Sequence, residues 1–106
     1  MSDAGIAFET SISSLDGRDT LRVIGEIDIA TAPAFLEAME RAIEGRENLE
    51  LDLRNTTFMD SSGVAALVAV HRRLGQRRGA IVLREPAAAV RQVLAITGVD
   101  ALFDLR

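Results

Sequence analysis

The middle of the chain constrains the fold most, because a strand pattern there passes directly into a helix pattern. Leu49, Leu51 and Leu53 alternate with charged residues, as in a strand with one buried face, and the run continues towards Phe58. From Val64 to Leu74 the apolar residues recur at helical spacing. Strands separated by helices imply parallel crossover connections within one sheet. The segment therefore predicts an α/β fold.

The flanking segments extend this alternation of strands and helices. Residues 6–15 and 21–24 are predicted to pair as an antiparallel hairpin around a short turn. One helix is expected after Thr31, which is a good N-cap residue, and another is expected to open at Pro86. The continuous apolar run 80–83 lies between helices and is typical of a strand buried on both faces.

These elements together define the expected architecture. It is a mixed sheet of four to five strands with an antiparallel N-terminal hairpin, packed against three to four helices. A short last turn at 99–102 and a short strand at 103–105 complete it. The length of 106 residues is close to the common domain size, so residues 1–106 are expected to form a single domain.

The composition excludes several classes of site and partner. The chain has no cysteine, which rules out disulfides and thiolate metal sites. The net charge of −4 argues against general nucleic-acid binding. The sequence does not open with a signal-peptide pattern, and no apolar run approaches the roughly 18 residues of a membrane span. We therefore expect a cytoplasmic protein that neither binds nucleic acid nor inserts into a membrane.

The run Asp60-Ser61-Ser62-Gly63 lies at the junction between the predicted strand and the predicted helix. Backbone N–H groups are unpaired at a helix start and favour negative charge, including phosphate. A serine at this position can cap the helix, act as a nucleophile, or accept a phosphoryl group. Capping is worth about 1 kcal/mol and requires only one serine. The residues alone therefore leave a structural and a functional role open.

A serine hydrolase is disfavoured by the spacing of its candidate residues. The histidine of the chain, His71, follows the two serines by nine or ten residues on the same predicted helix, which is about 14 Å along its axis. A serine–histidine hydrogen bond requires about 2.6–3.2 Å. The residues around Ser61 also lack the Gly-x-Ser-x-Gly pattern. His71 falls on the apolar stripe of the helix, which favours a packed histidine.

Metal and nucleotide sites are also weakly supported by the sequence. Asp28, Asp52 and Asp60 could approach one another near the strand ends, but no histidine pair or acidic loop organises them. A phosphoaspartate receiver domain relies on a lysine, and this chain has none. Neither of the glycine-rich phosphate loop patterns is present. We expect no metal and no cofactor.

Two signatures point to a known family. The first is the run 25–32, Gly-Glu-Ile-Asp-Ile-Ala-Thr-Ala, and the second leads from Asp52-Leu53-Arg54 to the run 58–64, Phe-Met-Asp-Ser-Ser-Gly-Val. The segment from Pro86 to Gly98 is similar to the last major helix of the same family. On these residues the chain resembles a stand-alone STAS domain of the bacterial anti-sigma factor antagonist family, over nearly its whole length.

The resemblance implies a partner-switching protein and not an enzyme. In that family the serine directly after the aspartate, here Ser61, is phosphorylated. The kinase is the anti-sigma factor itself, a protein with serine kinase activity and the histidine-kinase-like ATPase fold. The unphosphorylated antagonist binds this kinase and a sigma factor goes free. A PP2C-type phosphatase restores the binding form.

The resemblance also implies that Asp28 helps to form the partner-binding surface. We expect Asp28→Ala to weaken kinase binding while leaving the melting temperature nearly unchanged. The residues expected at this surface flank the two strand ends: Asp28, Thr31, Asp60, Ser61, Ser62, Gly63 and Val64.

One departure from the family pattern is Glu85, at a position where many relatives carry a serine as a helix cap. Glutamate caps poorly, so the helix after it is expected to be weaker by up to about 1 kcal/mol. A second candidate function also stays open. The chain could serve as a non-catalytic STAS subunit of a lipid-transport or stress-signalling assembly.

Overall fold

The computed structural model describes residues 8–15, 18–76 and 79–106 of the chain. The first two predicted residues of the N-terminal strand, 6 and 7, lie outside the described residues, as do residues 16 and 17 of the predicted turn. The elements, in chain order, are β1 (Phe8–Leu15), β2 (Arg18–Ile27), α1 (Ala32–Ala42), β3 (Leu49–Asp52), β4 (Thr56–Met59), α2 (Ser61–Gln76), β5 (Ile81–Arg84), α3 (Ala88–Ile96), a 3₁₀ turn at Asp100–Leu102 and β6 (Asp104–Leu105).

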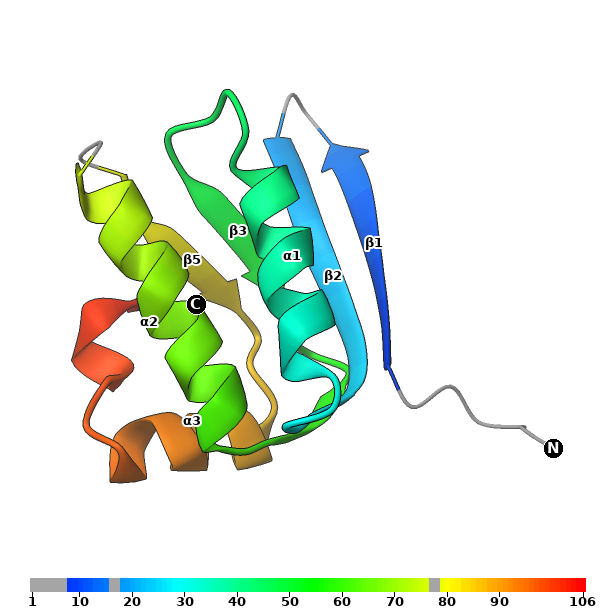
Figure 1. Cartoon of the computed structure of the whole chain (residues 1–106), viewed down its shortest axis with the longest axis vertical. Coiled ribbons are helices and arrows are strands. Elements are labelled where there is room, and N and C mark those ends of the chain that lie inside the picture. The colour runs from blue at the N-terminus through cyan, green and yellow to red at the C-terminus, as the bar shows by residue number, and fades with distance from the viewer. Residues whose placement is uncertain (1–7, 16–17, 77–78) are drawn as a thin grey trace, which may run out of the picture.

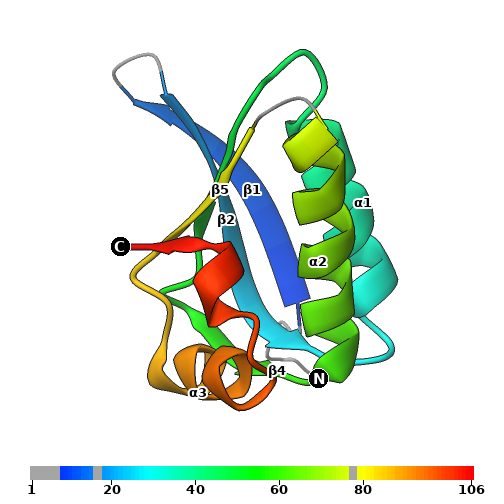
Figure 2. The same ribbon diagram turned by 90° about the vertical axis from the view of Figure 1, so that its left-hand side faces the viewer.

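A single mixed sheet and two helices form the main layers. The sheet order is β1-β2-β3-β5-β6, and β4 pairs with β2 beside β3. β1 and β2 are antiparallel, whereas the other pairs are parallel. Helices α1 and α2 cover one face of the sheet and α3 lies across one end of it, as Figures 1 and 2 show. The expected α/β class and the N-terminal hairpin are confirmed.

The strand expected to run from Leu49 towards Phe58 is divided into β3 and β4, so the described sheet has six strands instead of four to five. Both pieces pair in parallel with β2, and the register shifts between Gly25 and Glu26. Thr56 is the first residue after the break. Its side chain is fully buried, and its hydroxyl donates to the Val23 carbonyl at 2.9 Å. A buried hydroxyl must be paired in this way.

The core lies between the sheet and the two covering helices. The alternation along β3 buries Leu49 and Leu51, while Glu50 and Asp52 point to the other face. Phe35 of α1 and Leu67 of α2 are fully buried opposite the sheet. An ion pair of 2.7 Å between Arg73 and Glu40 also links α2 to α1. The apolar stripes that the sequence predicts are therefore the surfaces that join the layers.

The start of α3 differs from the expectation. Pro86 was expected to open the helix with Glu85 at the cap position, but the helix begins at Ala88 and Ala87 precedes it without a side-chain cap. Glu85 adopts the left-handed backbone conformation with φ 46°, and its carboxylate lies 3.7 Å from Arg54. The cap argument for Glu85 is therefore wrong, because the residue belongs to the turn before the helix. No helix of the described residues is long and apolar enough to cross a membrane.

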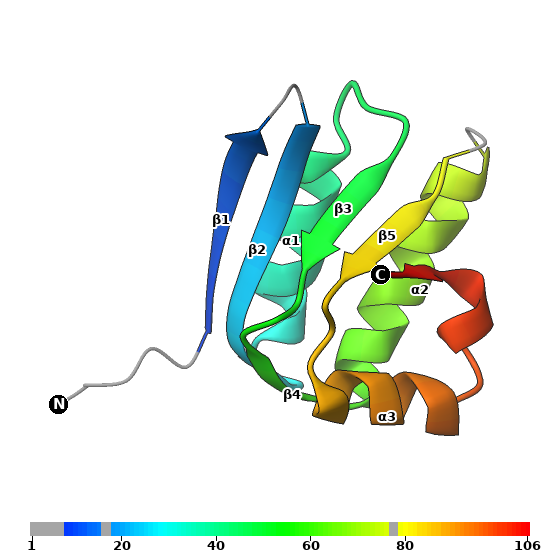
Figure 3. The same cartoon turned by 180° about the vertical axis from the view of Figure 1, so that it is seen from behind.

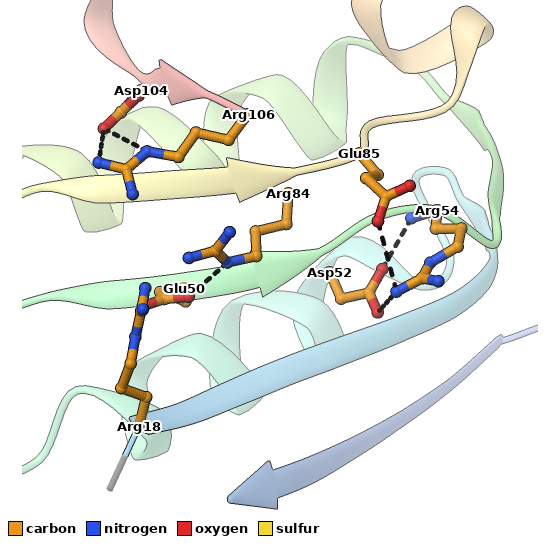
Figure 4. Close-up of polar contacts among 8 residues, drawn as sticks. All are labelled: Arg18, Glu50, Asp52, Arg54, Arg84, Glu85, Asp104 and Arg106. Atoms are coloured by element: carbon orange, nitrogen blue, oxygen red, sulfur yellow. Dashed lines mark hydrogen bonds and ion pairs between the residues drawn. The ribbon is translucent and has the colours of Figure 1, made fainter. Parts of the chain in front are cut away.

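No helix of the described residues covers the second face of the sheet (Figure 3), and paired charges line this face (Figure 4). Glu50 on β3 lies between Arg18 and Arg84, at 2.6 Å from each guanidinium. Arg54 pairs with Asp52 at 3.1 Å in the same layer. Burial raises the pKa of Glu50, but the hydrogen bonds and charges of Arg84 and Arg18 outweigh it and hold the pKa below the ordinary value of 4.5.

We predict that Glu50→Gln flattens the acid limb of the stability curve. A folded-state pKa below 4.5 means that the carboxylate stabilises the fold above pH 4.5. That contribution is lost as the pH falls through the lower folded-state value, and glutamine has no proton to take up. Urea unfolding followed by circular dichroism between pH 7 and pH 3 measures the slope. Glu44→Gln, at an exposed position, is the control. A Glu50→Gln slope equal to that of the unsubstituted chain would contradict the assignment.

Candidate functional site

Two distant segments of the chain meet at the carboxyl ends of β2 and β4. These strands are parallel, with Ile27 opposite Met59. Beyond the paired ends, the Asp60 N–H donates to the Ile27 carbonyl at 3.1 Å. Helices α1 and α2 therefore start at the same end of the sheet, side by side (Figure 1). The turn 28–31 and the first turn of α2 are therefore neighbours.

Asp28 organises the turn that leads into α1. Its Oδ1 accepts the N–H groups of Ala30 at 2.9 Å and Thr31 at 3.1 Å. In return the Thr31 hydroxyl accepts the Asp28 N–H at 2.9 Å and donates to the Glu26 carbonyl at 2.8 Å. Thr31 precedes the helix as predicted, but its side chain does not cap the α1 N–H groups. The side chains of Asp28 and Thr31 thus accept each other's backbone N–H groups. This is the arrangement of a capping box, but it lies in the turn before α1 and not in the first turn of the helix.

Asp60 performs the corresponding task for α2. Its Oδ1 accepts the Ser62 N–H at 2.8 Å, and its backbone carbonyl accepts the N–H groups of Gly63 at 3.1 Å and Val64 at 3.2 Å. Because Asp60 caps the helix, the capping role considered for the serines is not needed. Ser61 is exposed, and its hydroxyl makes no hydrogen bond to a described residue, while Ser62 is half-buried.

Gly63 and Val64 support the site from beneath. A Cβ on Gly63 would lie 2.6 Å from the Met59 Cγ and 2.8 Å from the Ile27 Cγ2, closer than side chains tolerate. Val64 is also buried, at 7% exposure. The missing side chain of Gly63 thus lets the first turn of α2 rest directly on the two strand ends.

The other candidate residues are not brought to this site. His71 is half-buried on α2, with its ring edge against Phe103 at a centroid distance of 5.7 Å. The helix is continuous from Ser61 to His71, so about 15 Å separates the two residues along its axis. Asp52 pairs with Arg54 on the uncovered face of the sheet. Within the described residues, no group of three histidine or carboxylate side chains could hold a metal ion.

The charge of the site is acidic and unbalanced. Glu26, Asp28 and Asp60 lie on the two segments that meet here, and none of the three forms an ion pair with a described residue. Sequence reasoning missed two exposed apolar neighbours, Ile29 at 80% exposure and Phe58 at 43%. The available signal was an isoleucine inside the polar turn that follows β2.

Comparisons with known proteins agree on one family. The family model described as "Mlab, STAS domain" matches residues 10–105. An anti-sigma-B factor antagonist of Listeria monocytogenes is 33% identical over 86 residues, which cover 79% of this chain and 75% of that protein. A STAS-domain containing protein of Pseudomonas aeruginosa is 31% identical over 97 residues, covering 91% of this chain and 96% of the relative.

Solved structures show the same fold. An anti-sigma factor antagonist from Mycobacterium paratuberculosis superposes with a TM-score of 0.77 and is 32% identical, covering 92% of this chain and 84% of that one. The antagonist SpoIIAA in its unphosphorylated form superposes with a TM-score of 0.75 at 22% identity, covering 92% of this chain and 88% of its own. At that lower identity the likeness concerns the fold alone.

We predict that Gly63→Ala destabilises the protein although alanine is the better helix former. The added methyl group would overlap buried Ile27 and Met59, and overpacking of this kind costs about 1–3 kcal/mol of unfolding free energy. Gly75→Ala on the same helix is the matched control, because among the described residues no atom beyond its chain neighbours and its own helix backbone lies within 4 Å of the added Cβ. That control should gain about 0.4–1 kcal/mol. Urea denaturation gives both values, and equal stability of the two variants would rule out the close contact.

Proposed function

The chain belongs to the STAS domain family, and we propose that it is an anti-sigma factor antagonist switched by phosphorylation of Ser61. The observation that carries the proposal is the exposed Ser61 hydroxyl at the start of α2, which the cap of Asp60 leaves without a structural task. Relatives at 32–33% identity are antagonists of anti-sigma factors, which supports the same role here. The chain would act as a binding module and not as an enzyme.

The proposed partner is an anti-sigma factor with serine kinase activity and the histidine-kinase-like ATPase fold. It would bind the unphosphorylated antagonist and release its sigma factor. A PP2C-type phosphatase would hydrolyse the phosphoserine and restore binding. We place this exchange in the cytoplasm, where ATP is available to the kinase. Five residues would form the contact surface, with Gly63 and Val64 beneath them: Asp28, Thr31, Asp60, Ser61 and Ser62.

The chemistry of the switch follows from charge. In the transfer, the Ser61 oxygen forms a bond to the γ-phosphorus of ATP as the bond to the β-phosphate oxygen breaks, and the serine proton leaves. The product carries a charge of about −1.5 to −2 at pH 7. In the complex this charge would lie against the partner, on the same surface as Asp28 and Asp60. Repulsion and lost hydration then oppose binding.

In the free protein the same phosphate is tolerable. Ser61 is exposed, so water screens its charge, and the N-terminal end of α2 favours an anion. The fold therefore survives a modification that the complex does not. A change from 99% bound to 1% bound requires about 5.5 kcal/mol of differential affinity. A divalent charge in a closed interface can supply energy of this order.

A second candidate is a non-catalytic STAS subunit of a lipid-transport or stress-signalling assembly. The family model that matches the chain carries the description "Mlab, STAS domain", which names no antagonist, and this favours the second candidate. The two functions differ at Ser61, because only an antagonist needs that hydroxyl as a kinase substrate.

We predict that an anti-sigma factor kinase encoded in the same genome phosphorylates Ser61. The test incubates the purified chain with ATP and each candidate kinase and locates the phosphate by mass spectrometry. Ser62→Ala should still be modified, whereas Ser61→Ala should not. Phosphate on Ser62, or on neither serine with any candidate, would remove the proposed switch and favour the structural subunit.

Two substitutions of Ser61 serve as controls for the charge argument. Ser61→Ala should keep its stability within about 0.5 kcal/mol, because the residue is exposed and does not cap the helix. It should bind the kinase permanently. Ser61→Asp should also fold and should bind more weakly, although a single charge imitates phosphoserine incompletely. Equal calorimetric affinities for the two variants would remove the electrostatic account.

We predict that Asp28→Asn separates the charge of Asp28 from its cap. The carboxylate accepts two backbone N–H groups, so Asp28→Ala is expected to cost about 0.5–2 kcal/mol, where the sequence alone predicts a nearly unchanged melting temperature. Asparagine keeps an acceptor oxygen and caps nearly as well. Asp28→Asn should therefore retain the melting temperature while weakening kinase binding at least about tenfold. Unchanged binding of Asp28→Asn would exclude a role for the charge.

A further inference from the structure

Ile29 is the most exposed of the large apolar side chains that the structure describes, at 80% exposure. It lies two residues after Ile27, whose carbonyl accepts the Asp60 N–H, so it belongs to the turn next to the start of α2. Single exposed apolar residues are common on protein surfaces and need no explanation by themselves. Ile29 differs from such residues in how its backbone is held and in which charges surround it.

The backbone around Ile29 is fixed on both sides. The Asp28 carboxylate accepts the N–H groups of Ala30 and Thr31, directly after Ile29. The Thr31 hydroxyl joins the turn back to the Glu26 carbonyl on β2. The turn therefore presents the isoleucine to solvent in one backbone conformation. A residue whose backbone is already ordered loses little backbone entropy when it binds, which favours a role as an interface anchor.

The charges around Ile29 indicate the chemistry of its partner. Glu26, Asp28 and Asp60 are acidic and form no ion pair with a described residue, whereas the acidic residues of the uncovered sheet face are neutralised by arginines. An exposed apolar side chain on a surface with unpaired acidic groups is complementary to an apolar socket with a cationic rim. A second copy of the chain, with its net charge of −4, would be repelled at long range.

We propose that Ile29 is the apolar anchor of the interface with the kinase, and that the kinase receives it in an apolar socket rimmed by arginine or lysine. The inference rests on the proposed function and adds to it the side chain that carries the affinity. Binding and switching then belong to two neighbouring segments. The turn 28–31 holds the partner through Ile29 and its acidic neighbours, and Ser61 at the start of α2 carries the switch.

The test compares Ile29→Ser with Ile96→Ser. Ile96 is 76% exposed at the end of α3, so it matches Ile29 in chemistry and exposure but not in position. Both variants should keep the melting temperature of the unsubstituted chain, because neither side chain is buried. Calorimetry uses the purified anti-sigma factor kinases of the same genome, loaded with ADP. Ile29→Ser should weaken binding about 30-fold or more, as expected of an anchor residue.

The controls distinguish the inference from the proposed function. Ile96→Ser should bind within about twofold of the unsubstituted chain, and Ile29→Val should retain most of the affinity. If Ile29→Ser binds normally while Asp28→Asn does not, the anchor is wrong and the antagonist function stands. If no kinase binds the unsubstituted chain, the proposed function fails and the anchor with it. A self-associated chain that Ile29→Ser converts to monomer in sedimentation would assign Ile29 to a second copy and overturn the proposal.

Discussion

The direct contact of the first turn of α2 with the ends of β2 and β4 is the constraint on which the site depends. The Asp60 N–H donates to the Ile27 carbonyl at 3.1 Å. Because Gly63 has no side chain, the helix packs directly against Ile27. A larger residue at position 63 would lift the helix start away from the strands. The turn 28–31 and Ser61 would then no longer share one surface, whatever their own conformations.

Within this arrangement, two aspartates, and not the Ser61 hydroxyl, accept backbone N–H groups that precede or open the helices. Asp28 satisfies N–H groups in the turn before α1, and Asp60 satisfies the Ser62 N–H at the start of α2. The Ser61 hydroxyl is consequently free for chemistry, because modifying it breaks no cap. The same two carboxylates make the surface acidic. A phosphate on Ser61 thus adds to an existing negative charge, which matters little in water and much in a closed interface.

The two acidic regions of the protein are built differently. On the uncovered face of the sheet, Glu50 is paired with two arginines, so this face contributes to stability and carries little free charge. At the strand ends the carboxylates hydrogen-bond to backbone N–H groups and meet no cation among the described residues. Backbone N–H groups satisfy the oxygens without cancelling their charge. The site therefore keeps the electrostatic field that a charged partner would sense.

By itself, the sequence determined the alternation of strands and helices, the N-terminal hairpin and the junction that carries Ser61. These features follow from local periodicity and from residue order. The tertiary structure decided which residue caps α2, where the strand at 49–58 breaks, that α3 begins after Glu85, and that Ile29 is exposed. Asp60, Ser61 and Ser62 are all competent caps, so local chemistry cannot choose among them. The choice is made by the position of the helix against Ile27, because a hydrogen bond across the fold depends on distances that only packing sets.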